Sequence, residues 1–278
     1  MTRRRWIADS WSPQSGHPTH ATLTGEQAAH LARVLRAQPG HIFDVVANGF
    51  LHRAEVTSVS DAEVLFTLHE ELEADAALPI HLLLAVFKFD HFEWAIEKAT
   101  ELGVARITPV LAHRTEKHLA LAALKRAERW RRIAFESAKQ SRRSDVPQIL
   151  DPTTLPAALA AETAPLRILL SETEQTLTLA AALTSNLGAL GLASETWDRS
   201  TIDLALAIGR VPHSLRSDGW DVENVLALAI GPEGGWTNNE ISLFAQPTWT
   251  HVTLGPRILR AETAAIAAIA IAASQLIS

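Results

Sequence analysis

The sequence predicts two parts, a small β-rich unit followed by an α/β domain built on a largely parallel sheet. Short β-like runs and turn residues fill the N-terminal part. From Pro79 onward, apolar runs alternate with amphipathic segments, which is the pattern of strands and helices in α/β domains. The acidic stretch 70–75 suits a linker between the two parts. We therefore expect domains at residues 1–75 and 76–278.

The β-rich unit is expected to hold one helix and several short strands. Thr24 and Gln27 have the spacing of a capping box, which predicts a helix that starts there and stops at Pro39-Gly40. Asn48-Gly49 is a hairpin turn signal between two β-like runs. The expected strands are 41–46, 51–59 and 63–68.

The α/β domain is expected to start with a buried strand at residues 80–86, because this run is continuously apolar. Residues 89–102 are amphipathic, and Gly103 suits the position that follows a helix end. Further strands are expected at 107–111, 168–170, 225–230 and 251–254, and helices at 120–141 and 261–277. The last helix is apolar nearly all round, so it belongs in a core or an interface. Residues 186–222 do not fit a compact unit and are interpreted as an insertion.

Composition excludes several kinds of chemistry. The chain of 278 residues has no cysteine, which excludes disulfides, thiolate zinc sites and a cysteine nucleophile. Its twelve histidines show no HExxH spacing, so we expect no metal site. No export signal follows the N-terminal arginines, and the apolar run 264–273 is too short to span a bilayer. We therefore expect a cytoplasmic protein without a membrane partner.

The charge distribution favours a nucleic-acid partner more than the net charge of −6 does. Eight basic residues face two acids between residues 125 and 143, and a second basic group lies near the N-terminus. That second group is Arg3, Arg4, Arg5, Arg33 and Arg36. On composition alone, a solvated helix face is the more frequent explanation of such a run, so both interpretations stay open.

The first motif with chemical meaning is Gly231-Pro232-Glu233-Gly234-Gly235, which follows an apolar strand directly. Three glycines within five residues let the backbone turn sharply and approach a ligand closely. The motif lacks the GxGxxG spacing of a dinucleotide site and the Gly-Lys-Ser/Thr of a P-loop. A plain surface turn is the alternative.

The second motif runs from Leu254 to Ala264 and places Arg257 and Arg260 before a helix. Two guanidinium groups beside a helix N-terminus favour an anion or a developing negative charge. Glu262 and Thr263 open the helix, and capping is the simpler explanation for them.

Together these two motifs resemble the cofactor loops of the SPOUT methyltransferases, and within that class the ribosomal RNA small-subunit methyltransferase E family. The similarity extends to residues 30–36, 88–109 and 129–143, and Arg114 stands where that family has an arginine. Residues 186–222 depart from the family pattern and make this region longer than usual.

The resemblance implies an N-terminal PUA-like β-barrel that helps to bind RNA and a C-terminal α/β domain with a trefoil knot. It also implies a homodimer with the active site between subunits, and S-adenosylmethionine bound in the knot. The residues that would hold the cofactor are Leu169, Leu170, Gly231, Pro232, Glu233, Gly234, Gly235, Leu254, Gly255, Arg257, Ile258, Leu259 and Arg260.

The reaction implied is methylation at N3 of a uridine in small-subunit (16S) ribosomal RNA, either as naked RNA or in an assembled subunit. Neutral uracil N3 is a poor nucleophile, so a base and a positive charge near the developing anion are needed. Candidates for the charge are Arg260, Arg142 and Arg114, and Glu262 is a candidate base. Candidates for RNA contacts are Arg3, Arg4, Arg5, Arg33, Arg36, Arg129, Lys139, Arg142 and Arg143.

Three other functions stay open on the sequence. A SPOUT enzyme acting on a ribose 2′-hydroxyl is one alternative, but the N-terminal domain and the match at residues 257–263 favour the base-methylating family. A non-catalytic RNA-binding or ribosome-assembly protein would keep the fold but lose cofactor-loop glycines, and Gly231, Gly234, Gly235 and Gly255 are all present. A Rossmann-type oxidoreductase is disfavoured because its fingerprint is missing.

Overall fold

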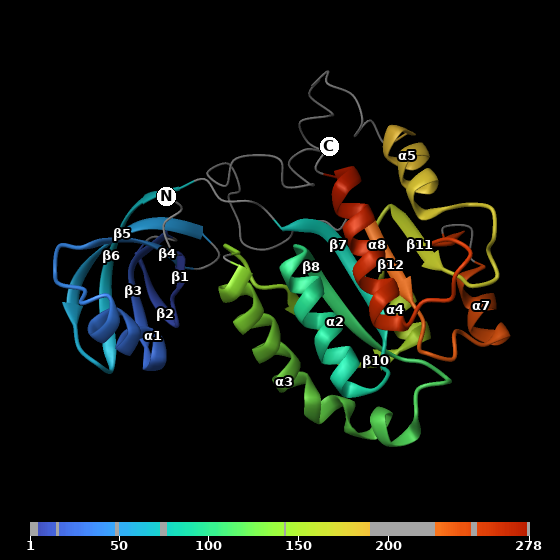
Figure 1. Ribbon diagram of the computed structural model, residues 1–278, viewed down its shortest axis with the longest axis horizontal. Helices are drawn as coiled ribbons and strands as arrows, with labels where there is room; N and C mark the ends of the chain where they lie inside the picture. The colour runs from blue at the N-terminus through green and yellow to red at the C-terminus, as the bar shows by residue number, and fades with distance from the viewer. Residues whose placement is uncertain are drawn as a thin grey trace. The chain divides into compact units, whose positions relative to one another are not determined.

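A computed structural model describes residues 5–14, 17–47, 50–72, 77–141, 143–189, 226–245 and 249–276 (Figure 1). Its internal contacts divide the chain into two compact units, which are described separately. The first unit contains residues 1–76 and 138–146, and the change from one unit to the next falls between residues 76 and 77.

The first unit is a curled six-stranded sheet with the order β1-β4-β5-β6-β3-β2. All neighbouring strands are antiparallel except β1 and β4, which pair in parallel. Its apolar core includes Leu31, Val45, Val64 and Phe66. The strands are β1 (Arg5–Ile7), β2 (Ser10–Gln14), β3 (His17–Thr24), β4 (Ile42–Ala47), β5 (Phe50–Val59) and β6 (Glu63–Glu71). Strands β4 to β6 match the predicted ones, whereas β1 to β3 were not foreseen.

The predicted helix of this unit is shorter than expected and differently capped. It consists of α1 (Gly25–Ala29) followed by a π-helical turn (His30–Val34). The predicted capping box is wrong, because the side chain of Thr24 makes no capping hydrogen bond. Instead, the hydroxyl and the amide of Thr24 donate to the Asp9 carboxylate at 3.0 and 2.7 Å. A charged acceptor in the connection between β1 and β2 therefore takes the donors that the local pattern had assigned to the helix.

The second unit contains a seven-stranded sheet in which every pairing is parallel, as the alternation of strands and helices predicted. The strand order is β10-β8-β7-β12-β11-β13, and β9 pairs with β8 outside this path. The strands are β7 (Leu78–Ala85), β8 (Val104–Leu111), β9 (Gln148–Ile149), β10 (Thr153–Thr154), β11 (Leu166–Leu170), β12 (Leu226–Ile230) and β13 (Trp249–Val252).

Helices cover both faces of this sheet, which explains why its central strands are apolar throughout. On one face α2 and α8 pack against each other and the sheet, and on the other face α4 and α7 lie together (Figure 1). Gly103 follows α2 with φ +96°, as the sequence predicted. The helices are α2 (Phe89–Glu101), α3 (Lys117–Ser141), α4 (Leu155–Ala161), α5 (Leu179–Ala189), α7 (Asn238–Phe244) and α8 (Ala261–Leu276). Within the described ranges, no helix has the length and apolar character needed to cross a membrane.

The strand order brings the ends of β11, β12 and β13 together. Strand β12 lies between β7 and β11, and β13 lies on the far side of β11. In parallel sheets, ligands bind beyond the carboxyl ends of strands where the chain changes direction across the sheet. The trefoil knot stays a prediction. Most of the predicted insertion 186–222 lies outside the described residues.

Candidate active site

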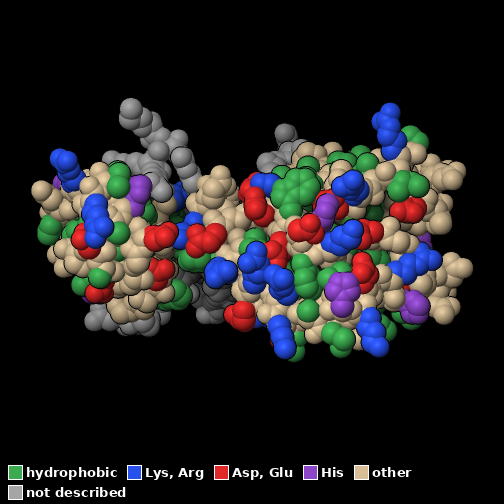
Figure 2. All heavy atoms as spheres, turned by 60° about the horizontal axis from the view of Figure 1, so that its bottom comes forward, with side chains coloured by type: hydrophobic (Ala, Val, Ile, Leu, Met, Phe, Trp, Pro, Cys, Tyr) green, Lys and Arg blue, Asp and Glu red, His purple; other side chains and the backbone are tan. Residues whose placement is uncertain are grey.

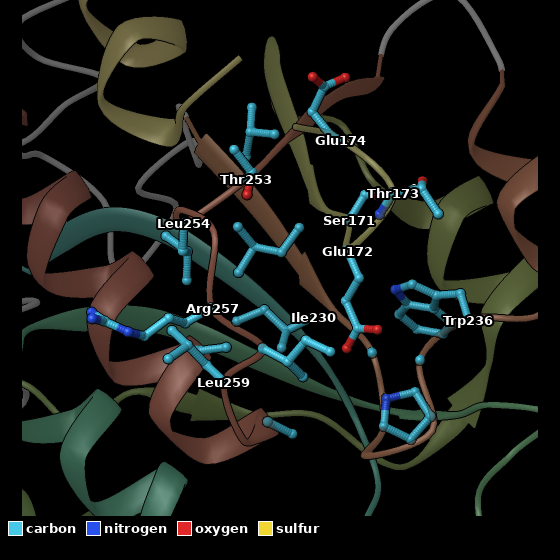
Figure 3. A pocket seen from close by; sticks show the side chains of 18 of the residues that line it. Ser171, Glu172, Thr173, Glu174, Ile230, Trp236, Thr253, Leu254, Arg257 and Leu259 are labelled. Carbon is cyan, nitrogen blue, oxygen red and sulfur yellow. Dashed lines mark hydrogen bonds between the residues drawn. The ribbon is translucent and has the colours of Figure 1, made fainter. Parts of the chain in front are cut away.

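A cavity of about 790 Å³ lies beyond the carboxyl ends of β11, β12 and β13. Figure 3 shows side chains from all three strand ends around one space, among them Ser171, Ile230 and Thr253. The three lining segments are residues 170–175, 230–236 and 252–259, and Arg114 joins them from the connection between β8 and α3. The volume suits a small-molecule ligand.

The glycine-rich loop after β12 is tightly packed. The amide of Gly235 donates to the carbonyl of Pro232 at 2.7 Å, and Gly235 has φ +69°. A Cβ atom added to Gly231 would lie 3.1 Å from the indole nitrogen of Trp236. That nitrogen is buried and has no hydrogen-bond partner among the described residues. Larger residues would therefore displace the loop from the edge of the cavity.

The carboxylate of Glu240 links the end of the glycine-rich segment to the connection between β8 and α3. Glu240 accepts hydrogen bonds from the amide and the hydroxyl of Thr237 at 2.8 Å, completing a capping box at the start of α7. Its other oxygen accepts from the amide of His113 at 2.7 Å. The neighbouring Arg114 donates from its guanidinium to the carbonyl of Gly234. The sequence indicated Arg114 at the site. It did not indicate the capping box, whose Glu240 also holds His113, the residue before Arg114.

The turn after β11 was missed by the sequence analysis, which named only Leu169 and Leu170 there. Glu174 holds this turn together: its Oε1 accepts from the amide of Thr176 at 2.8 Å, from the Thr176 hydroxyl at 2.6 Å and from the amide of Leu177 at 3.0 Å. These hydrogen bonds, first that from the Thr176 hydroxyl, lower the pKa of Glu174 to about 2. The usable signal was the position of these polar residues directly after a buried parallel strand.

The segment after β13 is tied to the same turn. The amide of Thr253 donates to the carbonyl of Leu177 at 2.9 Å, and its hydroxyl accepts from the amide of Gly255 at 3.1 Å. Gly255 has φ +118°, a conformation that other residues rarely adopt. The following Ile258 is 82% exposed at the edge of the cavity.

The cavity gathers most of the residues that the sequence analysis assigned to the cofactor. Those that line it are Leu170, Gly231, Pro232, Glu233, Gly234, Gly235, Leu254, Gly255, Arg257, Ile258 and Leu259. Two are not in the lining: Leu169 is buried in the core, and Arg260 is exposed directly before α8. Arg142, the remaining arginine candidate, lies outside the described residues.

Glu262, the candidate base, is directed away from the cavity lining. It is 3% exposed, and its Oε1 lies 2.8 Å from Nδ1 of His91 on α2. Its Oε2 is buried without a hydrogen-bond partner among the described residues. Its position in the first turn of α8 is favourable to the helix dipole.

The candidate RNA-binding residues have varied surroundings. Figure 2 shows Lys and Arg side chains on the face that carries α3, interleaved with acidic ones. Arg129 is paired with Glu93 at 2.8 Å, Arg33 with Asp61 at 2.8 Å, and Arg143 with Asp145. Arg143 is also largely buried. Arg5, Arg36 and Lys139 are at least partly exposed, whereas Arg3 and Arg4 lie outside the described residues.

Glu97 and Glu101 both contact the ammonium group of Lys98 at 2.8 Å, so both carboxylates are used in ion pairs. In the part of the chain that the structure covers, no group of three or more metal-ligating side chains occurs.

Comparison with known proteins agrees with this fold and site. The profile of an RNA methyltransferase domain matches residues 74–209 and 213–273, and that of an RNA methyltransferase PUA domain matches residues 23–68. The chain therefore belongs to the class of RNA methyltransferases.

The most similar relatives specify the family. The ribosomal RNA small subunit methyltransferase E of Synechocystis is 34% identical over 90% of this chain and 71% of its own length. That of Bacillus subtilis is 30% identical over 89% of this chain and 87% of its own. A Legionella pneumophila methyltransferase solved with bound S-adenosylmethionine superposes with a TM-score of 0.67 at 25% identity, covering 99% of this chain and 98% of its own. The chain belongs to the ribosomal RNA small subunit methyltransferase E family.

Proposed function

We propose that the protein binds S-adenosylmethionine in this cavity and transfers its methyl group to N3 of a uridine in small-subunit ribosomal RNA. The observation that carries the proposal is the convergence of three strand-end segments, one of them glycine-rich, on a single cavity. The names of the Synechocystis and Bacillus subtilis relatives support the RNA substrate. The cofactor bound to the Legionella protein supports the ligand.

The residues present fit this cofactor. A Cβ would fit tightly at two loop positions: one on Gly231 would lie 3.1 Å from the indole nitrogen of Trp236, and one on Gly234 would lie 3.1 Å from Cδ of Arg114. The loop thus keeps its backbone at the edge of the cavity, where amide groups bind adenine or carboxylate edges. Bound S-adenosylmethionine would supply an activated methyl group, so alignment and exclusion of water are the main tasks of the protein.

The arginines at the cavity suit the charge that develops on the base. Removing the proton from N3 places negative charge on the uracil oxygens, and a fixed guanidinium group stabilises it. Arg114 is held in place at the cavity by the carbonyl of Gly234, and Arg260 stands exposed before α8. We assign Glu262 to positioning the first turn of α8, because its carboxylate contacts His91.

The remaining features complete the proposal. The PUA domain and the exposed basic residues would contact RNA phosphates, which position a substrate without reading its sequence. The apolar helix α8 would contribute to a homodimer interface with the active site between the subunits.

The test is methyl transfer to small ribosomal subunits from a strain lacking its own family member. Purified protein and S-adenosylmethionine labelled in the methyl group would be incubated with these subunits or with naked 16S RNA, followed by mass spectrometry of nucleosides. Labelled 3-methyluridine is the expected product. Labelled 2′-O-methyluridine would establish the ribose-directed alternative. Cofactor binding without transfer to either substrate would favour the non-catalytic RNA-binding alternative.

A further inference from the structure

The lining of the cavity contains several charged residues. Among the described residues that line it, three have carboxylates (Glu172, Glu174 and Glu233) and two have guanidinium groups (Arg114 and Arg257). Charged groups in a recessed site act on a ligand more strongly than the same groups on an open surface, because less water screens them. The ligand preference of the cavity therefore depends on which of these groups point into it.

Two of these carboxylates lie two residues apart and differ in their use. Glu174 is occupied by the amides and the hydroxyl of its own turn, and Figure 3 shows its carboxylate pointing away from the cavity. Glu172 extends into the cavity toward the glycine-rich loop. Within the described part of the chain, the Glu172 carboxylate has no hydrogen bond or ion pair, so its charge is available to a ligand.

The position of Glu172 is defined by the loop across the cavity. Its Oε2 lies 4.0 Å from the point that a Cβ on Gly235 would occupy. Nη1 of Arg114 lies 3.8 Å from the same point, and that guanidinium is held by the carbonyl of Gly234. Arg114 and Glu172 thus flank one glycine without forming an ion pair among the contacts of the structure. A bound ligand that reaches Gly235 meets the carboxylate of Glu172.

We infer that Glu172 is a specificity-determining residue that favours a cationic adenosyl sulfonium ligand over its neutral thioether. This inference rests on the proposed function. S-Adenosylmethionine carries a sulfonium, an ammonium and a carboxylate group, for a net charge of +1. Loss of the methyl group leaves S-adenosylhomocysteine, a thioether with no net charge. A carboxylate in the cavity stabilises the first more than the second, so it favours the methyl donor and weakens retention of the product.

The test is calorimetric titration of the full chain with each of the two ligands. In Glu172→Gln, the dissociation constant for S-adenosylmethionine should rise by about three- to tenfold, as expected for one charge–charge contact that water partly screens. The constant for S-adenosylhomocysteine should change by less than about twofold, because its sulfur is neutral. The measured quantity is therefore the ratio of the two constants. Glu172→Asp keeps the charge and should retain most of the preference.

Two control variants separate this effect from others. Glu174→Gln loosens the turn and should weaken both ligands alike, leaving the ratio unchanged. Glu128→Gln removes one charge from the exposed face of α3 and should change neither constant. Circular dichroism would verify that each variant folds.

Each result bears on a different claim. Equal weakening of both ligands by Glu172→Gln, or no weakening of either, would overturn the role of Glu172 while leaving the proposed function intact. Failure of the folded wild-type protein to bind S-adenosylmethionine would overturn the proposed function and this inference with it.

Discussion

Two buried glutamates each face a histidine, one within the sheet core and the other beside the cavity. Glu162 lies 2.5 Å from Nδ1 of His81, and its other oxygen accepts from the amide of Ala164 at 2.7 Å. Glu262 uses one oxygen for His91 and leaves the other without a partner among the described residues. Each oxygen of the first carboxylate therefore has a partner, Oε2 through the ion pair with His81 and Oε1 through the amide of Ala164, as expected of a structural ion pair. Incomplete satisfaction of the second, one residue from the cavity lining, is typical of a site where function limits stability.

The largest expected effect follows from breaking the fully buried pair. His81→Ala would leave the carboxylate of Glu162 buried without its partner and should lower the free energy of unfolding by about 3–5 kcal/mol. Urea denaturation followed by circular dichroism measures this loss. The double variant with Glu162→Leu should lose less, because no unpaired charge remains. A single-variant loss below about 1 kcal/mol would contradict a structural role for the pair.

The corresponding change beside the cavity should cost less. His91→Ala removes the partner of Glu262, but the side chain of His91 is 32% exposed and water can replace it. We expect a loss of about 1–2 kcal/mol in the same denaturation experiment. If His91→Ala lowered the free energy of unfolding as much as His81→Ala, the two pairs would contribute equally to stability. That result would contradict the difference described above.

A third prediction concerns the free energy of unfolding at acidic pH. Burial alone would raise the pKa of Glu162, but the hydrogen bond and charge of His81, with the amides of Ala164 and Thr163, lower it overall. A pKa lower in the folded than in the unfolded chain stabilises the protein above about pH 4.5. That contribution is lost as the pH falls through the lowered pKa.

Glu162→Gln should therefore flatten the fall in stability below about pH 4.5, because it removes the group whose pKa is lowered on folding. Urea midpoints measured across this range would show it. An unchanged slope in Glu162→Gln would contradict the lowered pKa.

The smallest expected effect concerns catalysis. Glu262→Gln keeps the size of the side chain and a group that hydrogen-bonds to His91, so methyl transfer should fall by less than about threefold. A general base contributes about 10²- to 10⁴-fold to a rate, so a loss of that size would restore Glu262 as the base. Single-turnover methylation of small ribosomal subunits distinguishes the two outcomes.

Local patterns predicted the parallel sheet and the glycine-rich loop, and the comparison of two threonines shows where such patterns fail. Thr24 has capping-box spacing but gives its donors to Asp9, fifteen residues away on the chain. Thr237 and Glu240 form a capping box that the sequence analysis did not use. The spacing is the same in both segments, but folding brings other partners to the first one: Asp9 takes the donors of Thr24, and the side chain of Gln27 donates to the carbonyl of Ile7 at 3.3 Å.

The same limit applies to the site and the buried pairs. Leu170, Gly231 to Gly235 and the segment after β13 were named from motifs, since their glycines and position are visible in the sequence. The turn at residues 171–175 is marked in the sequence only by its position after a buried strand, and the contact between His81 and Glu162 carries no mark at all. Both features depend on the order of the strands in the folded sheet, where β12 lies between β7 and β11 although it follows both in the sequence.

The strand order also has a consequence for synthesis on the ribosome. The strands of the second unit leave the exit tunnel in the order β7, β8, β11, β12 and β13, and the segment of residues 252–259 comes after all of them. Domains generally fold as units during translation. A nascent chain that stopped before residue 249 would contain the glycine-rich loop, the turn after β11 and most of the sheet, yet one wall of the cavity would be missing. The cavity would thus be complete only after β13 and the segment that follows it have joined the sheet.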